Sequence, residues 1–198
     1  MAYHHGNLRD TLIYTGDLEL QERGPESLSL REIAKRAGVS HNAPYRHFES
    51  KSALIDQIIQ KTLTDLSEQM LTAPLLYPAS VLLQVQYVGR LWCRLALQSP
   101  KKAHLIFSGQ SRNDLNQNKK YHEHQILLQN LITLLSDRRG NDLKVNTPCD
   151  SLSLTLIACI QGLTIMQTSD TFGFRFEDEE FLELSDRSVE NILLSHLT

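Results

Sequence analysis

Apolar residues recur along this chain at spacings of three and four positions, and no sustained alternation of apolar and polar residues is found. Such spacing lines one face of an α-helix with apolar side chains, whereas alternation would line one face of a strand. The segment from Asn7 to Arg23 follows the helical rule and ends at Gly24-Pro25, a glycine followed by a helix breaker. Gly16 in its middle costs roughly 1 kcal/mol relative to alanine, so we expect another element to pack closely there. The pattern predicts an all-α protein.

Two short helices are predicted next. Ser29 begins the first with the capping-box spacing to Glu32, in which the hydroxyl and the carboxylate each satisfy a backbone N–H of the first turn. This helix ends at Gly38. Ser40 is placed to cap the second short helix, which we expect to continue to Phe48.

Longer helices follow the two short ones. They are predicted at about 50–70, 79–98, 100–108, 117–138, 148–169 and 178–196. Two of these starts place a proline directly after a hydroxyl residue, at Ser99-Pro100 and Thr147-Pro148, where the missing N–H of proline is harmless. A break containing prolines separates the first long helix from the others, and the polar residues 136–147 predict a surface loop.

The two short helices and the glycine turn between them have the layout of a helix-turn-helix. In this motif the first helix braces the second, whose first residues reach base edges and whose backbone amides face phosphate. His41, Asn42 and Ala43 are small or polar at that position, and Asn and His offer hydrogen bonds in the major groove. The sequence therefore predicts a DNA-reading element within residues 29–48.

The charge distribution supports this prediction once it is counted locally. The formal net charge is −3, which taken alone speaks against a protein that binds a polyanion. Residues 29–51, however, contain five basic side chains and two acidic ones, whereas residues 170–190 contain eight acidic and two basic. A basic DNA-contacting surface is thus concealed by an acidic segment elsewhere, and its phosphate contacts would make binding strongly dependent on salt.

The run from Ser29 to Leu54 resembles the DNA-binding domain of the tetracycline-repressor (TetR/AcrR) family. The matching positions are the Ala37-Gly38-Val39-Ser40 turn, Tyr45, His47, Phe48, Lys51 and Leu54. The resemblance implies a homodimeric transcriptional regulator, usually a repressor, that binds double-stranded DNA and whose C-terminal helices bind a small effector and dimerise. Its operator is then near-palindromic, and we expect the effector to release the protein from it.

One subgroup of this family resembles the chain further, through the opening residues 3–9 and the stretch from Ser40 to Phe48. The C-terminal domain of that subgroup is named for a Trp-His-Gly motif. Only Gly162 of this motif is present here, with Ile157 and Gln161 where Trp and His are expected. The effector chemistry of the subgroup is therefore not carried over to this chain.

The expected DNA contacts divide by role. We assign phosphate contacts to Tyr45 and Lys51 and base readout to His41 and Asn42, while His47 either contacts phosphate or closes the turn. The full set of expected DNA-binding residues is Ser29, Arg31, Ser40, His41, Asn42, Ala43, Tyr45, Arg46, His47 and Lys51.

Three parts of the chain are expected: a helix-turn-helix DNA-binding domain at residues 1–50, a linking helix at 51–70, and an effector-binding and dimerisation domain at 71–198. Aromatic and polar residues of the last part either line an apolar effector pocket or form ordinary core. They are Tyr87, Trp92, Phe107, Tyr121, His124, Gln161 and Met166. The last two long helices are expected to pair with their copies in a four-helix bundle. The residues expected in that interface are Leu152, Leu156, Ile160, Leu163, Phe181, Val189, Ile192 and Leu193.

Other function classes have little support in the sequence. The three cysteines form no Cys-x-x-Cys pair, and His122 and His124 are two residues apart on a helix, so we expect no metal site. No nucleophile elbow or phosphate loop is found, which argues against an enzyme and against a cofactor. The uncharged stretches 71–89 and 151–169 fit buried helices better than membrane spans, and we expect a cytoplasmic protein. An alternative is a dimeric DNA-binding regulator whose C-terminal domain is packed or binds a protein partner and takes no small-molecule effector.

Overall fold

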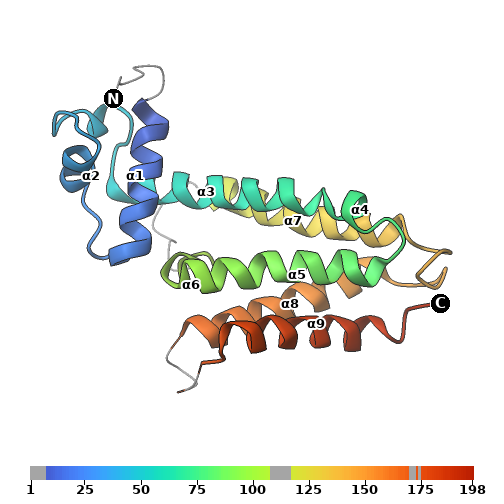
Figure 1. Ribbon diagram of the computed structural model, residues 1–198. Helices are drawn as coiled ribbons and strands as arrows, with labels where there is room; N and C mark the ends of the chain where they lie inside the picture. The colour runs from blue at the N-terminus through green and yellow to red at the C-terminus, as the bar shows by residue number, and fades with distance from the viewer. Residues whose placement is uncertain (1–7, 108–116, 170–172, 174) are drawn as a thin grey trace.

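The computed structural model describes residues 8–107, 117–169, 173 and 175–198, without the side chains of residues 117–124. The described residues form helices and no β-strand, with isolated bridges only, at Arg139, Leu143 and Leu197. Figure 1 shows an elongated molecule in which short helices gather at one end and long helices run side by side toward the other. The prediction of an all-α fold is confirmed.

The first helix, α1 (Leu8–Arg23), packs closely against α3 (Lys51–Met70). A Cβ added to Gly16 would lie 3.1 Å from side-chain carbons of both Ile58 and Leu54, so the helices approach at this glycine as the sequence predicts. Gly24 ends α1 with a φ of 85°, in the left-handed region that favours glycine.

The second helix, α2 (Leu30–Arg36), begins directly after Ser29, but the Ser29 hydroxyl makes no capping hydrogen bond. The predicted capping box is therefore not formed. The start of the helix is instead held by burial, because Leu28 and Leu30 on either side of Ser29 both lie in the core. Gly38, with a φ of 70°, turns the chain after α2.

The α-helix predicted from Ser40 to Phe48 is wrong. Residues 41–43 form turns, and only the single 3₁₀ turn η1 (Pro44–Arg46) follows. Pro44 has no N–H to donate to the Ser40 carbonyl, which accepts instead from the Ala43 N–H at 2.9 Å. The chain then leaves η1 with the N–H of Phe48 donating to the Pro44 carbonyl at 2.9 Å.

The remaining helices lie close to their predicted positions. They are α4 (Ala73–Leu76), α5 (Val81–Gln98), α6 (Pro100–Phe107), α7 (Gln117–Ser136), α8 (Cys149–Thr168) and α9 (Asp178–Leu193). The hydroxyls of Ser50 and Ser80 cap α3 and α5 by accepting from backbone N–H groups, and α6 begins at Pro100 as expected. The structure differs at Pro148, which is the N-cap of α8 and not its first residue, and at α4, a short helix inside the predicted proline-bearing break.

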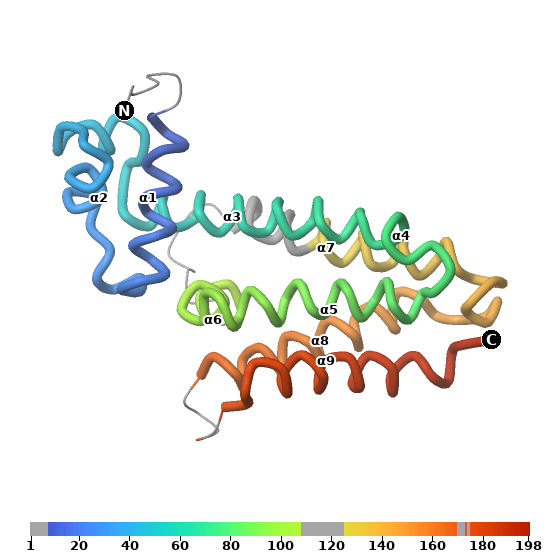
Figure 2. Tube along the Cα trace, viewed as in Figure 1, coloured from blue at the N-terminus to red at the C-terminus, as the bar shows by residue number. Residues whose placement is uncertain are grey.

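One continuous apolar core extends through the molecule, and α3 connects its two ends. α3 lies against α1 near one end and against α7 and α5 along the rest of its length (Figure 2). Leu12 of α1, Leu63 of α3 and Leu193 of α9 all belong to this single cluster. The short amino-terminal helices, called here the amino-terminal unit (α1, α2 and η1), are therefore packed directly onto the bundle formed by α4–α9.

The helix α8 is long and apolar enough to cross a membrane by length and composition alone, with a mean hydropathy of 1.5. It is the one such helix among the described residues. In the fold it packs against α5, α6, α7 and α9, and a third of its apolar window is buried inside the chain. Its position is that of a bundle helix with one face left uncovered.

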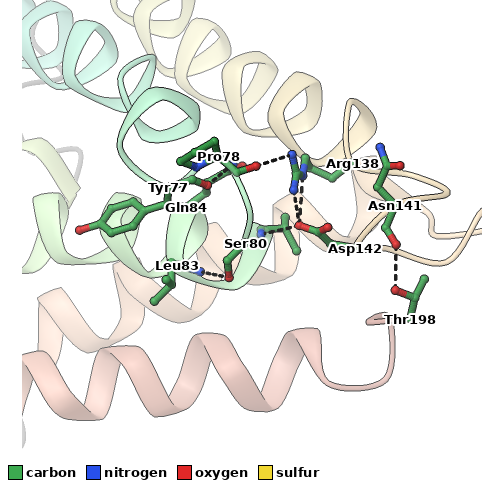
Figure 3. Close-up of polar contacts among 10 residues, drawn as sticks. Tyr77, Pro78, Ser80, Leu83, Gln84, Arg138, Asn141, Asp142 and Thr198 are labelled. Carbon is green, nitrogen blue, oxygen red and sulfur yellow. Dashed lines mark hydrogen bonds and ion pairs between the residues drawn. The ribbon is translucent and has the colours of Figure 1, made fainter.

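At the end of the molecule opposite the amino-terminal unit, polar contacts join the α7–α8 loop to α5 and to the last residue (Figure 3). Asp142 accepts from the Val81 N–H at 2.8 Å and from the Arg138 guanidinium, and the Thr198 hydroxyl donates to the Asn141 carbonyl at 2.8 Å. Burial would raise the pKa of Asp142, but the hydrogen bonds from Arg138 and Val81 hold it below its ordinary value. The loop is therefore stabilised by an ionised carboxylate.

Candidate nucleic-acid interface and effector cavity

The segment 40–47 forms an exposed polar surface at the end of the amino-terminal unit. Ser40, His41, Asn42, Arg46 and His47 are exposed. Tyr45 is also exposed, whereas Ala43 and Pro44 are buried and anchor the segment to the core. Because the turn is compact, its polar side chains are brought together without an α-helix.

The positive charge available at this surface is smaller than the five basic residues counted in 29–51 suggest. Arg36 donates to the carboxylates of Glu19 and Glu22, each at 2.8 Å, and so fastens α2 to α1. Hydrogen bonds from Arg36 hold the pKa of Glu22 below its ordinary value. Arg31 and Arg46 have no ion-pair partner within the part of the chain that the structure describes, and both are exposed. These two cations, rather than Arg36, are available to a polyanion.

Lys51, expected to contact phosphate, is occupied in the structure by two backbone carbonyls. Its Nζ donates to the carbonyl oxygens of Pro25 at 3.1 Å and Glu26 at 3.2 Å, and the side chain is half-buried. The lysine thereby fixes the loop between α1 and α2 to the start of α3. Ser29 is likewise half-buried, so the structure does not place these two residues with the exposed segment 40–47.

Arg9 is a residue of this surface that the sequence reasoning did not select. Its guanidinium lies 5.7 Å from the centroid of the Phe48 ring and donates to the Gln57 amide oxygen. The side chain is placed beside the end of the 40–47 segment from a different helix. Arg9 belongs to the opening residues 3–9 that resemble the subgroup, and this position in the sequence could have marked it as a candidate DNA contact.

The amino-terminal unit is joined to α6 by two lysines. Lys102 Nζ lies 2.8 and 3.1 Å from the two carboxylate oxygens of Asp17, and Lys101 Nζ donates to the Glu22 carbonyl at 2.9 Å. The Lys102 side chain is only 7% exposed, although lysine is rarely buried. A charged pair is thus held between the unit and the bundle.

The expected effector residues do not form one pocket. Trp92 and Phe107 contact each other with ring centroids 5.2 Å apart, and Trp92 and Gln161 line a small apolar cavity of about 30 Å³ between α5, α7, α8 and α9. Tyr87 is directed elsewhere, toward Tyr77, with ring centroids 5.9 Å apart. Met166 is half-buried and does not line this cavity, and the side chains of Tyr121 and His124 lie outside the described residues.

The residues expected at a dimer interface are mostly used inside the chain. The buried members of the set are Leu152, Leu156, Ile160, Phe181, Val189 and Leu193, each between 0 and 6% exposed. Leu163 and Ile192 are half-buried against the same core. These side chains pack within one chain, and their place in a dimer interface stays a prediction; along α8, which is largely apolar, periodicity does not mark the inward face.

A different stripe of α8 is open to solvent. Leu154, Ala158 and Gly162 are exposed and are spaced four residues apart on one face. Leu154 is 55% exposed, and a Cβ added to Gly162 would meet nothing within 4 Å. Ile165 continues the stripe as a half-buried residue. This apolar stripe of small and branched side chains has no cover among the described residues.

Comparison with known proteins connects these surfaces to a family. A family model described as "Bacterial regulatory proteins, tetR family" matches residues 18–58, from α1 into α3. The HTH-type transcriptional repressor KstR2 of Rhodococcus jostii (strain RHA1) is 40% identical over 45 residues, which are 23% of this chain and 22% of that relative. The family-model match thus falls on the amino-terminal unit and the start of α3.

Solved structures match over nearly the full length. A TetR-family regulator from Mesorhizobium loti MAFF303099 aligns with a TM-score of 0.71 at 18% identity, covering 96% of each chain. The regulator FadR from Bacillus subtilis in complex with stearoyl-CoA aligns with a TM-score of 0.73 at 15% identity, covering 92% of this chain and 96% of that one. At these identities the structures show the shared fold. The chain is thus similar to the TetR family of bacterial regulatory proteins, in sequence over residues 18–58 and in fold over nearly its full length.

Proposed function

We propose that the chain is a dimeric transcriptional repressor that binds a near-palindromic operator through its amino-terminal unit and is released by a small effector. The observation that supports DNA binding most directly is the exposed segment 40–47, with Arg31 and Arg46 free of carboxylates among the described residues. In this arrangement His41 and Asn42 read base edges, while Tyr45 and Arg46 contact phosphate. The domain limits proposed are residues 1–50, 51–70 and 71–198.

Dimerisation is proposed through the open stripe of α8. Exposed Leu154, Ala158 and Gly162 allow two copies of α8 to approach closely across a two-fold axis, because small residues let helix backbones come near. The uncovered apolar surface favours such a partner. In the dimer the two amino-terminal units would face successive major grooves, about 34 Å apart or a modest multiple of it.

The proposed effector site is the cavity lined by Trp92 and Gln161. Its lining is apolar except for Gln161, which favours an apolar effector with one hydrogen-bonding group. FadR, whose fold is similar, was solved in complex with stearoyl-CoA, a ligand with a long apolar chain, which supports an apolar effector. An effector larger than the cavity must bind a conformation in which α5 and α8 lie farther apart, and release of DNA follows if that conformation misplaces the amino-terminal units.

One observation favours a second candidate function. The cavity of about 30 Å³ has room for only one or two water molecules. A regulator with a packed bundle that responds to a protein partner would need no larger space. A thermal-shift screen distinguishes the two candidates, because an effector that binds the folded state raises the melting temperature by mass action. Palmitate and stearoyl-CoA are the first compounds to screen.

The DNA-binding proposal is tested by selecting operator fragments with the purified protein and measuring affinity by fluorescence anisotropy at several salt concentrations. We expect Arg46→Gln to weaken binding on all sequences and to lower the salt slope by about one, whereas Asn42→Ala changes sequence preference. Arg187→Gln, which removes an exposed guanidinium from α9, is the control and should bind as wild type. Equal affinities for wild type and Arg46→Gln at every salt concentration would remove this surface from the DNA interface.

A further inference from the structure

A second and much larger hollow lies where the amino-terminal unit meets the bundle. It is a cleft of about 690 Å³ lined by residues of α1, α3, α5 and α6. Figure 2 shows α1 passing the beginning of α3, with one end of α1 close to α6. The volume is within the range of about 300–1,000 Å³ that small-molecule sites occupy, whereas the cavity beside Trp92 is far below it.

The base of the cleft is apolar and is contributed by separate helices. Ile13 of α1, Ile58 and Leu66 of α3, and Leu91 of α5 are each 7% exposed or less. Tyr14 of α1 stands at the edge of the cleft with 66% of its surface exposed. The hollow thus offers an apolar base and an aromatic side chain, which suits the apolar part of an amphipathic ligand.

Charged groups of the cleft are mostly paired with one another. Lys102 pairs with Asp17, and Lys61 pairs with Asp65 at 3.1 Å. Arg94 is different, because it is exposed and has no ion-pair partner among the residues that the structure describes. Asp10 also lines the cleft and already has a partner. The guanidinium of Arg94 is therefore the cation of the cleft left without a carboxylate among the described residues, and its planar donors recognise a carboxylate, sulfonate or phosphate.

We propose that this cleft binds an amphipathic organic anion, with the anionic group on Arg94 and the apolar body over Ile13, Ile58 and Leu91. Such a ligand would contact α1 and α5 at once. Its binding would hold the amino-terminal unit against the bundle in the orientation seen here. The site is separate from the cavity beside Trp92, and it does not depend on the proposed effector or on DNA binding.

Anilinonaphthalene sulfonate, an aromatic anion that fluoresces in apolar surroundings, is the probe. We expect saturable binding to the intact protein without DNA. Arg94→Gln should raise the Kd at least about fivefold, and Arg94→Lys, which keeps the positive charge, should stay within about threefold of wild type. Arg187→Gln is the matched control and should bind as wild type. Because Arg94 and Arg187 are exposed, these variants are expected to fold.

Methyl NMR on the same samples locates the probe. We expect the largest shifts at Ile13, Ile58 and Leu66, and smaller ones at Leu156 and Val189 beside the small cavity. Thr62→Trp, which fills the cleft from α3, should abolish these shifts while its circular dichroism stays that of wild type. The proposal is overturned if the probe does not bind, if Arg94→Gln binds like wild type, or if only the methyls around the small cavity shift.

Discussion

The ion pair between Asp17 and Lys102 should stabilise the protein asymmetrically. The Lys102 side chain is 7% exposed and that of Asp17 is 26% exposed. Asp17→Asn would leave a buried ammonium without a carboxylate, and we expect it to lower the free energy of unfolding by about 2–3 kcal/mol, near the lower limit for a broken buried pair. Lys102→Met would leave Asp17 with water and with the Gln21 amide, which donates to it at 3.0 Å, so we expect a loss of only about 1 kcal/mol.

The double variant Asp17→Asn/Lys102→Met separates the free energy of the ion pair from the independent effects of the two substitutions. Once Lys102 is methionine, Asn at position 17 removes no partner, so the double variant should resemble Lys102→Met alone. The coupling free energy of the cycle is then about 2–3 kcal/mol, the full loss expected for Asp17→Asn alone. Urea unfolding followed by circular dichroism at neutral pH and one fixed protein concentration measures all four proteins, with m-values compared to check that the unfolded states match. Losses that add within about 0.5 kcal/mol, or a larger loss for Lys102→Met, would refute the reasoning.

Three further predictions concern the bundle. Leu154→Asp should convert the proposed dimer to a monomer in light scattering after gel filtration, because it places a charge in the open stripe of α8; a dimer that persists would move the interface elsewhere. Asp142→Asn should be less stable than wild type at pH 7, and the difference should shrink as the pH falls below about 4. Folding lowers the pKa of this carboxyl, so its ionised form stabilises the protein above the unfolded pKa. That stabilisation is lost as the pH falls through the folded pKa. Urea midpoints at both pH values test this. Burial raises the pKa of the Cys93 thiol to about 11. Iodoacetamide at pH 8 should therefore leave Cys93 unmodified and modify the half-buried Cys159, which mass spectrometry of tryptic peptides measures. Equal labelling of the two cysteines would contradict the burial of Cys93.

The long helices could be predicted because their ends are set by local chemistry. Ser50 and Ser80 accept from N–H groups three residues later, and Pro100 begins α6. The same local chemistry was available for η1, since Pro44 removes the N–H that a helix from Ser40 would need. The prediction of a helix there followed the cap position of Ser40 and did not count the missing N–H of Pro44 against it.

Contacts between residues distant in sequence explain what the sequence did not predict. Lys102 and Asp17 are 85 positions apart, and nothing in their neighbours marks them as a pair. The inward face of α8 depends on which helices cover it, so Leu156 and Leu154 look equivalent in the sequence although one is buried and the other exposed. The cleft needs four helices at once, and Arg94 is notable only because its neighbours in the fold leave it unpaired.

The helix α5 separates the two hollows. Leu91 lines the cleft against the amino-terminal unit, while Val88 and Trp92, on either side of it in the sequence, line the cavity inside the bundle. A ligand that widened the small cavity would have to displace α5 or the helices facing it, since the buried side chains are closely packed. A displacement of α5 would change the shape of the cleft, which residues of α1, α3, α5 and α6 line. If an effector in the small cavity changes the affinity of the cleft for its anion, linkage requires that the anion changes the affinity of the cavity for the effector by the same factor. The proposed anion and the proposed effector would then act on one equilibrium through α5.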